Sequence, residues 1–119
     1  MLNQIVLVGR LVRNPEVYTT ETGKKVTTIT LAIPRSFKNI NGEYETDFID
    51  CILWENIAVS TSEYCSKGNI IGVKGRVQSR VIEREDKTKK YLVEVVAEKV
   101  TFLSTSKKDM DSNEEEAEK

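Results

Sequence analysis

Two aromatic residues on one expected strand, Phe48 and Trp54, are the first candidates for binding chemistry in this chain. Side chains on a strand alternate between its two faces, so Phe48, Asp50 and Trp54 share one face of the segment 46–54. A buried face rarely holds a carboxylate without a partner, so we expect this face to be partly wet. Exposed rings there can stack on nucleic-acid bases. The alternative is that the rings cap the core or support a helix, and the residues alone leave both interpretations open.

A row of cations follows on a later strand, over residues 73–84. One face of this strand is small and apolar, with Val73, Gly75, Val77, Ser79 and Val81. The opposite face is mostly cationic, with Lys74, Arg76, Gln78, Arg80, Ile82 and Arg84. Like charges in a row repel one another, so an anion such as a phosphate backbone would stabilise them. The alternative is an exposed strand that its charges keep soluble and protect from edge pairing.

Two loops and the N-terminal segment add further candidates. Phe37 stands beside Arg35 and Lys38 near an expected hairpin turn at 39–42, where a ring and cations can hold a base and its phosphates. A ring tucked into the core is the alternative for Phe37. More cations extend this row. Lys87, Lys89 and Lys90 lie in the loop after the strand, for which a solvated turn is the default interpretation. Arg10 and Arg13 lie in the N-terminal segment and are a weaker extension.

Catalytic and metal-binding chemistry finds little support in the sequence. The chain has no histidine, which excludes His-dependent acid–base and nucleophilic catalysis. Cys51 and Cys65 lack the spacing of a zinc site and are expected to be buried, reduced thiols. No phosphate-binding glycine loop is present. We therefore expect a binding protein without catalytic residues, metal or cofactor.

The composition indicates one domain with a short tail. The chain has 119 residues and a net charge of −1. Residues 1–103 carry 15 Lys and Arg against 13 Asp and Glu, whereas residues 104–119 carry 3 against 6. No run is long and apolar enough to cross a membrane, and no signal peptide is visible, so a cytoplasmic location is expected. We expect a domain at 1–103 and a disordered acidic tail at 104–119.

Five expected strands and one helix must position the candidate residues. The strands are expected at 2–12, 26–35, 46–54, 69–84 and 91–103, and the helix at 55–67 with Gly68 just after its end. The order is β-β-β-α-β-β. Alternation predicts core faces that contain Ile29 and Leu31, then Cys51 and Leu53. The class is all-β with one helix, and a closed five-stranded barrel is the simplest way to hide the strand edges.

Several segments in the same order resemble the bacterial single-stranded DNA-binding protein family. One is Gly-Val-Lys-Gly-Arg at 72–76, and the others lie at 2–11, 14–16, 29–32, 46–49, 62–64, 67–68 and 94–96. The resemblance covers about residues 1–103. It implies an oligonucleotide-binding (OB) barrel and a homotetramer that wraps single-stranded DNA. It also implies roles in replication, recombination and repair at the nucleoid, without catalysis or a metal.

The resemblance also assigns residues. Three base-stacking positions of the family match Phe37, Phe48 and Trp54, whereas a further aromatic position falls near Ile82. The tail at 104–119 keeps the family's acidic character but lacks its Pro-Phe end, which leaves recruitment of replication and repair proteins uncertain. A second hypothesis is a replisome adaptor that uses the same barrel for protein contacts, as in the related primosomal replication protein N. Comparing affinities for a bare single strand and for a protein partner would separate the two.

Overall fold

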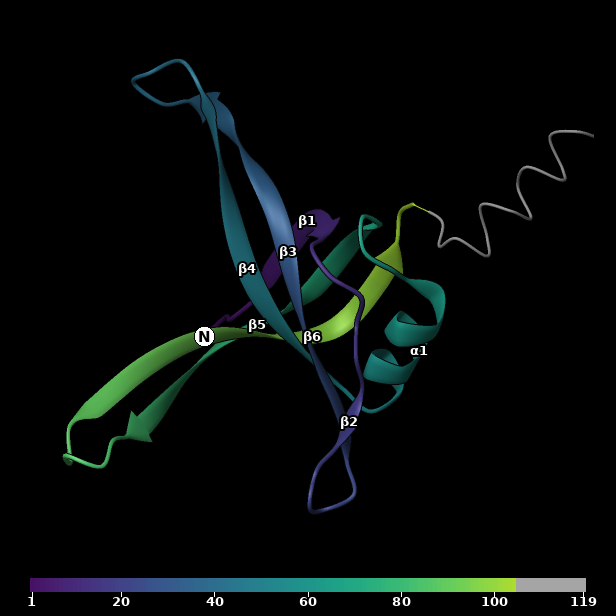
Figure 1. The fold of residues 1–119 in the computed structure, drawn as a ribbon, viewed down its shortest axis with the longest axis vertical. Helices are drawn as coiled ribbons and strands as arrows, with labels where there is room; N and C mark the ends of the chain where they lie inside the picture. The colour runs from purple at the N-terminus through teal and green to yellow at the C-terminus, as the bar shows by residue number, and fades with distance from the viewer. Residues whose placement is uncertain (105–119) are drawn as a thin grey trace, which may run out of the picture.

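The structure is a computed structural model that describes residues 1–104, so the expected tail, apart from Ser104, lies outside the described residues. It contains six strands and one helix (Figure 1). Their bounds are β1 (Ile5–Leu11), β2 (Tyr18–Thr19), β3 (Lys25–Lys38), β4 (Tyr44–Trp54), α1 (Asn56–Tyr64), β5 (Ile70–Glu83) and β6 (Lys89–Phe102). The two-residue strand β2 was not predicted, because a segment so short leaves no periodic pattern in the sequence.

The strands form one sheet in the order β1-β5-β6-β4-β3-β2, and a further pairing of β1 with β3 closes it into a barrel. The closing pairs are Arg10 with Ala32 and Leu11 with Leu31. All pairings are antiparallel except β4 with β6, which run parallel. The predicted five-stranded OB barrel with one helix is thereby confirmed, with β2 added at the edge of β3.

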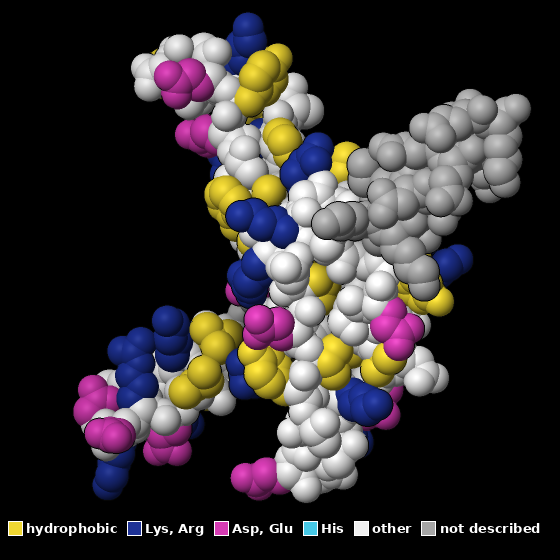
Figure 2. Space-filling model, turned by 45° about the vertical axis from the view of Figure 1, so that its right-hand side comes forward, with side chains coloured by type: hydrophobic (Ala, Val, Ile, Leu, Met, Phe, Trp, Pro, Cys, Tyr) yellow, Lys and Arg dark blue, Asp and Glu magenta, His cyan; other side chains and the backbone are white. Residues whose placement is uncertain are grey.

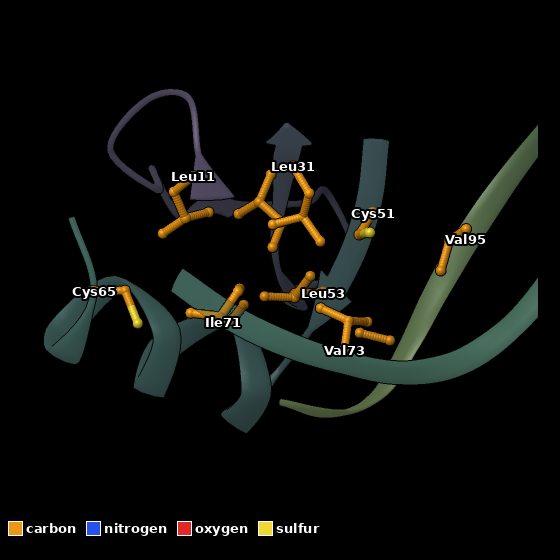
Figure 3. Packing of buried hydrophobic residues seen from close by; sticks show 11 residues of the cluster. Leu11, Leu31, Cys51, Leu53, Cys65, Ile71, Val73 and Val95 are labelled. Atoms are coloured by element: carbon orange, nitrogen blue, oxygen red, sulfur yellow. The ribbon is translucent and has the colours of Figure 1, made fainter. Parts of the chain in front are cut away.

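The core lies inside the barrel and under the helix (Figure 3). The residues predicted to face inward are buried, among them Ile29, Leu31, Cys51, Leu53 and Val73. Both cysteines are buried, as expected. Burial, with a smaller contribution from the neighbouring Asp50 carboxylate, raises the pKa of the Cys51 thiol to about 12.

Two long hairpins, β3–β4 and β5–β6, leave the barrel in different directions (Figure 1). In the first turn, the Asn39 side chain accepts hydrogen bonds from the backbone N–H groups of Asn41 and Glu43. Regular pairing of β3 with β4 ends at Pro34, as expected for a residue without an N–H donor, but the extended backbone continues to Lys38. The predicted end at Arg35 was therefore too early.

The helix is shorter than predicted. It spans Asn56–Tyr64 instead of 55–67, and Cys65 already has an extended backbone with φ −124° and ψ 149°. Leaving the helix here places the Cys65 side chain in the core beside Ile71 (Figure 3). Gly68 is therefore part of the following turn, where its N–H donates to the Leu11 carbonyl, and not the residue that ends the helix.

Gly75 lies at the point where β5 and β6 shift register. The pairing changes from Lys74 with Lys99 to Gly75 with Ala97, which leaves one extra residue on β6. A Cβ added at Gly75 would lie 2.1 Å from the Val96 carbonyl oxygen, closer than any real contact. Only glycine fits this crossing without moving the backbone of β6.

Replacing Gly75 with alanine should therefore lower the free energy of unfolding by about 3 kcal/mol, the upper part of the usual overpacking range. Gly72→Ala on the same strand is the matched control, since a Cβ there meets only ordinary contacts at 3.6 Å and beyond. Urea unfolding of the two variants measures the difference. Equal stabilities for Gly72→Ala and Gly75→Ala would show that the bulge does not restrict this position.

Candidate nucleic-acid interface

The parallel pairing of β4 with β6 brings the aromatic and cationic residues to one surface. Ile52 lies opposite Val96 of β6, and Val96 lies opposite Arg76 of β5. Directly paired residues point to the same side of a sheet, so this row continues from β4 across β6 to β5. We call the surface outside the barrel across β3, β4, β6 and β5 the outer sheet face. Its members include Thr28, Thr30, Ala32, Phe48, Asp50, Ile52, Trp54, Arg76, Gln78, Arg80, Glu94 and Val96.

Both rings of β4 are exposed on this face. Phe48 is 64% exposed and Trp54 is 39% exposed. The Asp50 carboxylate between them accepts a hydrogen bond of 2.6 Å from the Thr30 hydroxyl on β3, which supplies the partner that a carboxylate on this face needs. The rings therefore do not fill the core, and their flat faces are available to a ligand.

The cations of β5 are connected to an acid that the strand's own sequence does not contain. The Arg76 guanidinium donates to the Gln78 side-chain oxygen, and the Gln78 amide donates to Glu94 on β6 at 2.7 Å. Arg80 also lies 3.6 Å from Glu94. The Glu94 side chain is only 12% exposed, so it lies beneath the more exposed Arg80 side chain and contacts both Gln78 and Arg80. Lys74 and Arg76 are exposed, as predicted.

A hollow of about 240 Å³ separates the two hairpins where β4 and β6 diverge. Asp50 and Ile52 line one side, and Arg80 and Glu94 line the other. Lys and Arg side chains gather along the β5–β6 hairpin and between the two hairpins, with hydrophobic side chains among them (Figure 2). Apolar and cationic side chains thus border the same hollow, on the face that also carries Phe48 and Trp54.

Arg35 differs from the other predicted cations because two carboxylates already bind it. Its guanidinium forms ion pairs with Glu45 at 2.5 Å and Asp47 at 2.9 Å on β4. The hydrogen bond from Arg35, helped by its positive charge, lowers the pKa of the Asp47 carboxyl. The Asp47 carboxylate, with a smaller effect of Glu45, raises the pKa of Arg35. A phosphate would have to compete with both acids for this side chain.

The β3–β4 hairpin exposes its own rings beyond the barrel. Phe37 is 64% exposed, so it is not tucked into the core. The Lys38 ammonium lies 5.7 Å from the centre of the Tyr44 ring, within the range of a cation–π contact. Tyr44 is 60% exposed and was not singled out from the sequence, since its position opposite Lys38 depends on the register of the hairpin.

The remaining predicted cations fall at separate places. Arg10 lies in a row with Ala32 and Phe48, and its guanidinium donates to the Gly68 carbonyl at 2.6 Å. Lys90 lies opposite Ile82 and shares the face of Arg80. The other cations lie elsewhere along the chain: Arg84 and Lys87 are in the turn between β5 and β6, Lys89 is paired with Glu83 on the opposite side of the hairpin, and Arg13 follows β1.

Residues 1–104 contain no group of three or more His, Cys, Asp or Glu side chains arranged to hold a metal ion. No helix in this part of the chain has the length and apolar character to span a membrane.

Comparison with known proteins finds one family that matches most of the chain. The model of the single-strand binding protein family matches residues 2–103. Single-stranded DNA-binding protein B of Bacillus subtilis strain 168 is 46% identical over 103 residues, which cover 87% of this chain and 91% of that protein. Single-stranded DNA-binding protein 3 of Listeria innocua is 47% identical over 105 residues. That match covers 88% of this chain but 66% of the Listeria protein, so the relative extends well beyond the shared region.

Proposed function

Since the chain belongs to the single-strand binding protein family, we propose that it binds single-stranded DNA, independently of sequence, along the outer sheet face. Members of this family are DNA-binding proteins and not enzymes. The observation that carries the proposed site is the β4–β6 pairing, which puts Phe48 and Trp54 on the same face as Arg76 and Arg80. Roles in replication, recombination and repair are general to the family.

Stacking on exposed rings supplies the sequence-independent part of the affinity. Every base has a flat face, and each stacked base contributes about 1–3 kcal/mol. Phe48, Trp54 and Phe37 are the stacking residues, with exposed fractions of 64%, 39% and 64%. The cavity beside Asp50 and Ile52 gives the strand room to pass between the hairpins.

Neutralisation of phosphates supplies the salt-dependent part. Lys74, Arg76, Arg80 and Lys90 are exposed cations on or beside the outer sheet face. Arg10, Arg84, Lys87 and Lys89 are exposed cations farther from its centre. Each phosphate that a cation neutralises releases counterions and adds roughly 0.7 to the salt slope on a single strand. Arg35 contributes less, because Glu45 and Asp47 already neutralise it.

Self-association to a homotetramer is part of the same proposal. Val6 and Val8 on β1 are 67% and 52% exposed and point away from the core. Within the described strand β1, only Arg10 and Leu11 pair with β3, which leaves one edge of residues 5–9 open to a second copy. From the resemblance alone, we propose that the acidic tail recruits replication and repair proteins. We propose on the same ground that the protein is cytoplasmic and associated with the nucleoid.

Loss of one stacking ring should weaken binding measurably. Phe48→Leu keeps apolar volume but removes the flat ring, so its affinity for poly-dT should fall at least about fivefold. Quenching of Trp54 fluorescence, the only tryptophan in the chain, reports the binding. Phe102→Leu is the control, because Phe102 is 40% exposed but contacts Tyr64 of the helix. Equal affinities of the Phe48 variant and the wild type would exclude stacking at this ring.

Removing Arg76 and removing Arg35 should have different effects on the salt dependence. Arg76→Gln should reduce the magnitude of the salt slope by about 0.7, the value for one phosphate contact. Arg35→Gln should change the slope less, because the two carboxylates already hold this guanidinium. Titrations with poly-dT at several salt concentrations measure both slopes. A larger change of the salt slope for Arg35→Gln than for Arg76→Gln would contradict DNA binding along the outer sheet face.

A charge on β1 should weaken self-association. Val6→Lys places a cation on the proposed contact, and sedimentation velocity at micromolar concentration should show smaller species than the wild type. Ile40→Lys is the control, since Ile40 is fully exposed at the tip of the β3–β4 hairpin. A monomeric wild type would remove the association proposal and leave DNA binding to be judged separately.

A further inference from the structure

A further exposed ring, Tyr18 of β2, lies on the same face as Trp54. Tyr18 is paired with Val26 of β3, and Val26 is paired with Trp54 of β4. Because paired residues point to the same side of a sheet, the Tyr18 and Trp54 rings emerge on one face, two strands apart. Neighbouring strands are about 4.8 Å apart, so roughly 10 Å separates the two positions. Tyr18 is 62% exposed, more than Trp54.

A hollow of about 500 Å³ opens beside Tyr18, between the segment after β1 and strand β3. This volume lies within the range of ligand-binding pockets. Thr28 lines this hollow and also the smaller hollow of the outer sheet face between the two hairpins. The two hollows therefore share one lining residue, so they lie on either side of Thr28 on the same strand.

The charges around this hollow favour an anion. Arg13 and Lys67 contribute cationic side chains to its lining, against the single acid Glu16. The Glu16 carboxylate accepts a hydrogen bond of 2.7 Å from the Tyr18 hydroxyl, which also holds the ring in place. This bond raises the pKa of the Tyr18 hydroxyl, while the positive charge of Arg13 acts in the opposite direction.

The lining of this hollow thus combines an exposed ring, Tyr18, with two cations, Arg13 and Lys67. Thr27 also borders it, but this residue is paired with the core residue Leu53 and its side chain is buried.

We propose that this hollow is a further nucleotide subsite, in which Tyr18 stacks on a base of the bound single strand while Arg13 and Lys67 contact its phosphates. The inference rests on the proposed function, because the nucleotide belongs to the same DNA strand that crosses the outer sheet face. The shared lining residue Thr28, and the position of Tyr18 on the face of Trp54, favour this continuing strand over a free nucleotide.

Affinity measurements on the full chain test the ring and the cations separately. Tyr18→Leu should weaken binding of a long oligo-dT about fivefold or more, whereas Tyr18→Phe keeps the ring and should stay within about twofold of the wild type. Arg13→Gln combined with Lys67→Gln should lower the salt slope by about 1.4, for two phosphates. Lys24→Gln is the charge control, since Lys24 lies in the turn between β2 and β3 and does not line the hollow.

Crosslinking gives a readout that does not depend on affinity. Oligo-dT that carries 5-iodouracil should, on irradiation, form a crosslink to the peptide that contains Tyr18, identified by mass spectrometry. A wild type that binds oligo-dT without this crosslink, or a Tyr18→Leu variant of unchanged affinity, would overturn the subsite and leave the proposed function standing. A wild type that binds no oligo-dT would overturn the proposed function itself.

Discussion

Two residue pairs between parallel strands, Cys51 with Val95 and Ile52 with Val96, form the direct contact between the β3–β4 and β5–β6 hairpins. On the other side of the barrel, β1 joins β3 to β5. The first pair faces the core, and the second faces outward beside Arg76. This short contact joins a strand rich in aromatic residues to a hairpin rich in cations. Without it the two hairpins would be joined only through β1, and the aromatic strand and the cationic hairpin would not be neighbours in the sheet.

The outer sheet face is less positive than a simple row of lysines and arginines suggests. Glu94 holds Gln78 and lies beside Arg80, and the pair Glu45 and Asp47 holds Arg35. The ion pairs of Arg35 are exposed and individually weak, since exposed pairs contribute roughly 0–1 kcal/mol, and Arg80 lies 3.6 Å from Glu94. They orient the side chains in advance but let phosphates compete, so the acids on the face adjust its affinity instead of abolishing it.

Sequence reasoning succeeded where one strand's own alternation decides the outcome. The inward position of Ile29 and Cys51 and the outward position of Phe48 and Trp54 follow from the two-residue period alone. The barrel followed from the number of strands and the need to hide their edges. The proposed roles of these residues in DNA binding are predictions that the structure leaves to experiment.

What the sequence could not provide depends on pairing between distant segments. Glu94 beneath Arg80 and the acids around Arg35 are set by register across strands, which a single strand does not encode. The helix ended early because the core received Cys65, a tertiary effect that overrides the periodic pattern. Tyr18 was missed because β2 has two residues and its alignment with Trp54 passes through β3.

Both hairpins extend beyond the barrel, so most of their outer length touches no core residue. Such an arm can grow or shrink during evolution without disturbing the packing beneath it. The change must come in steps of two residues on each strand, because a step of one would exchange the two sides of the ribbon. Relatives with arms of different reach could then cover different lengths of polymer on an unchanged barrel, and arm length becomes a variable that selection can adjust independently of folding.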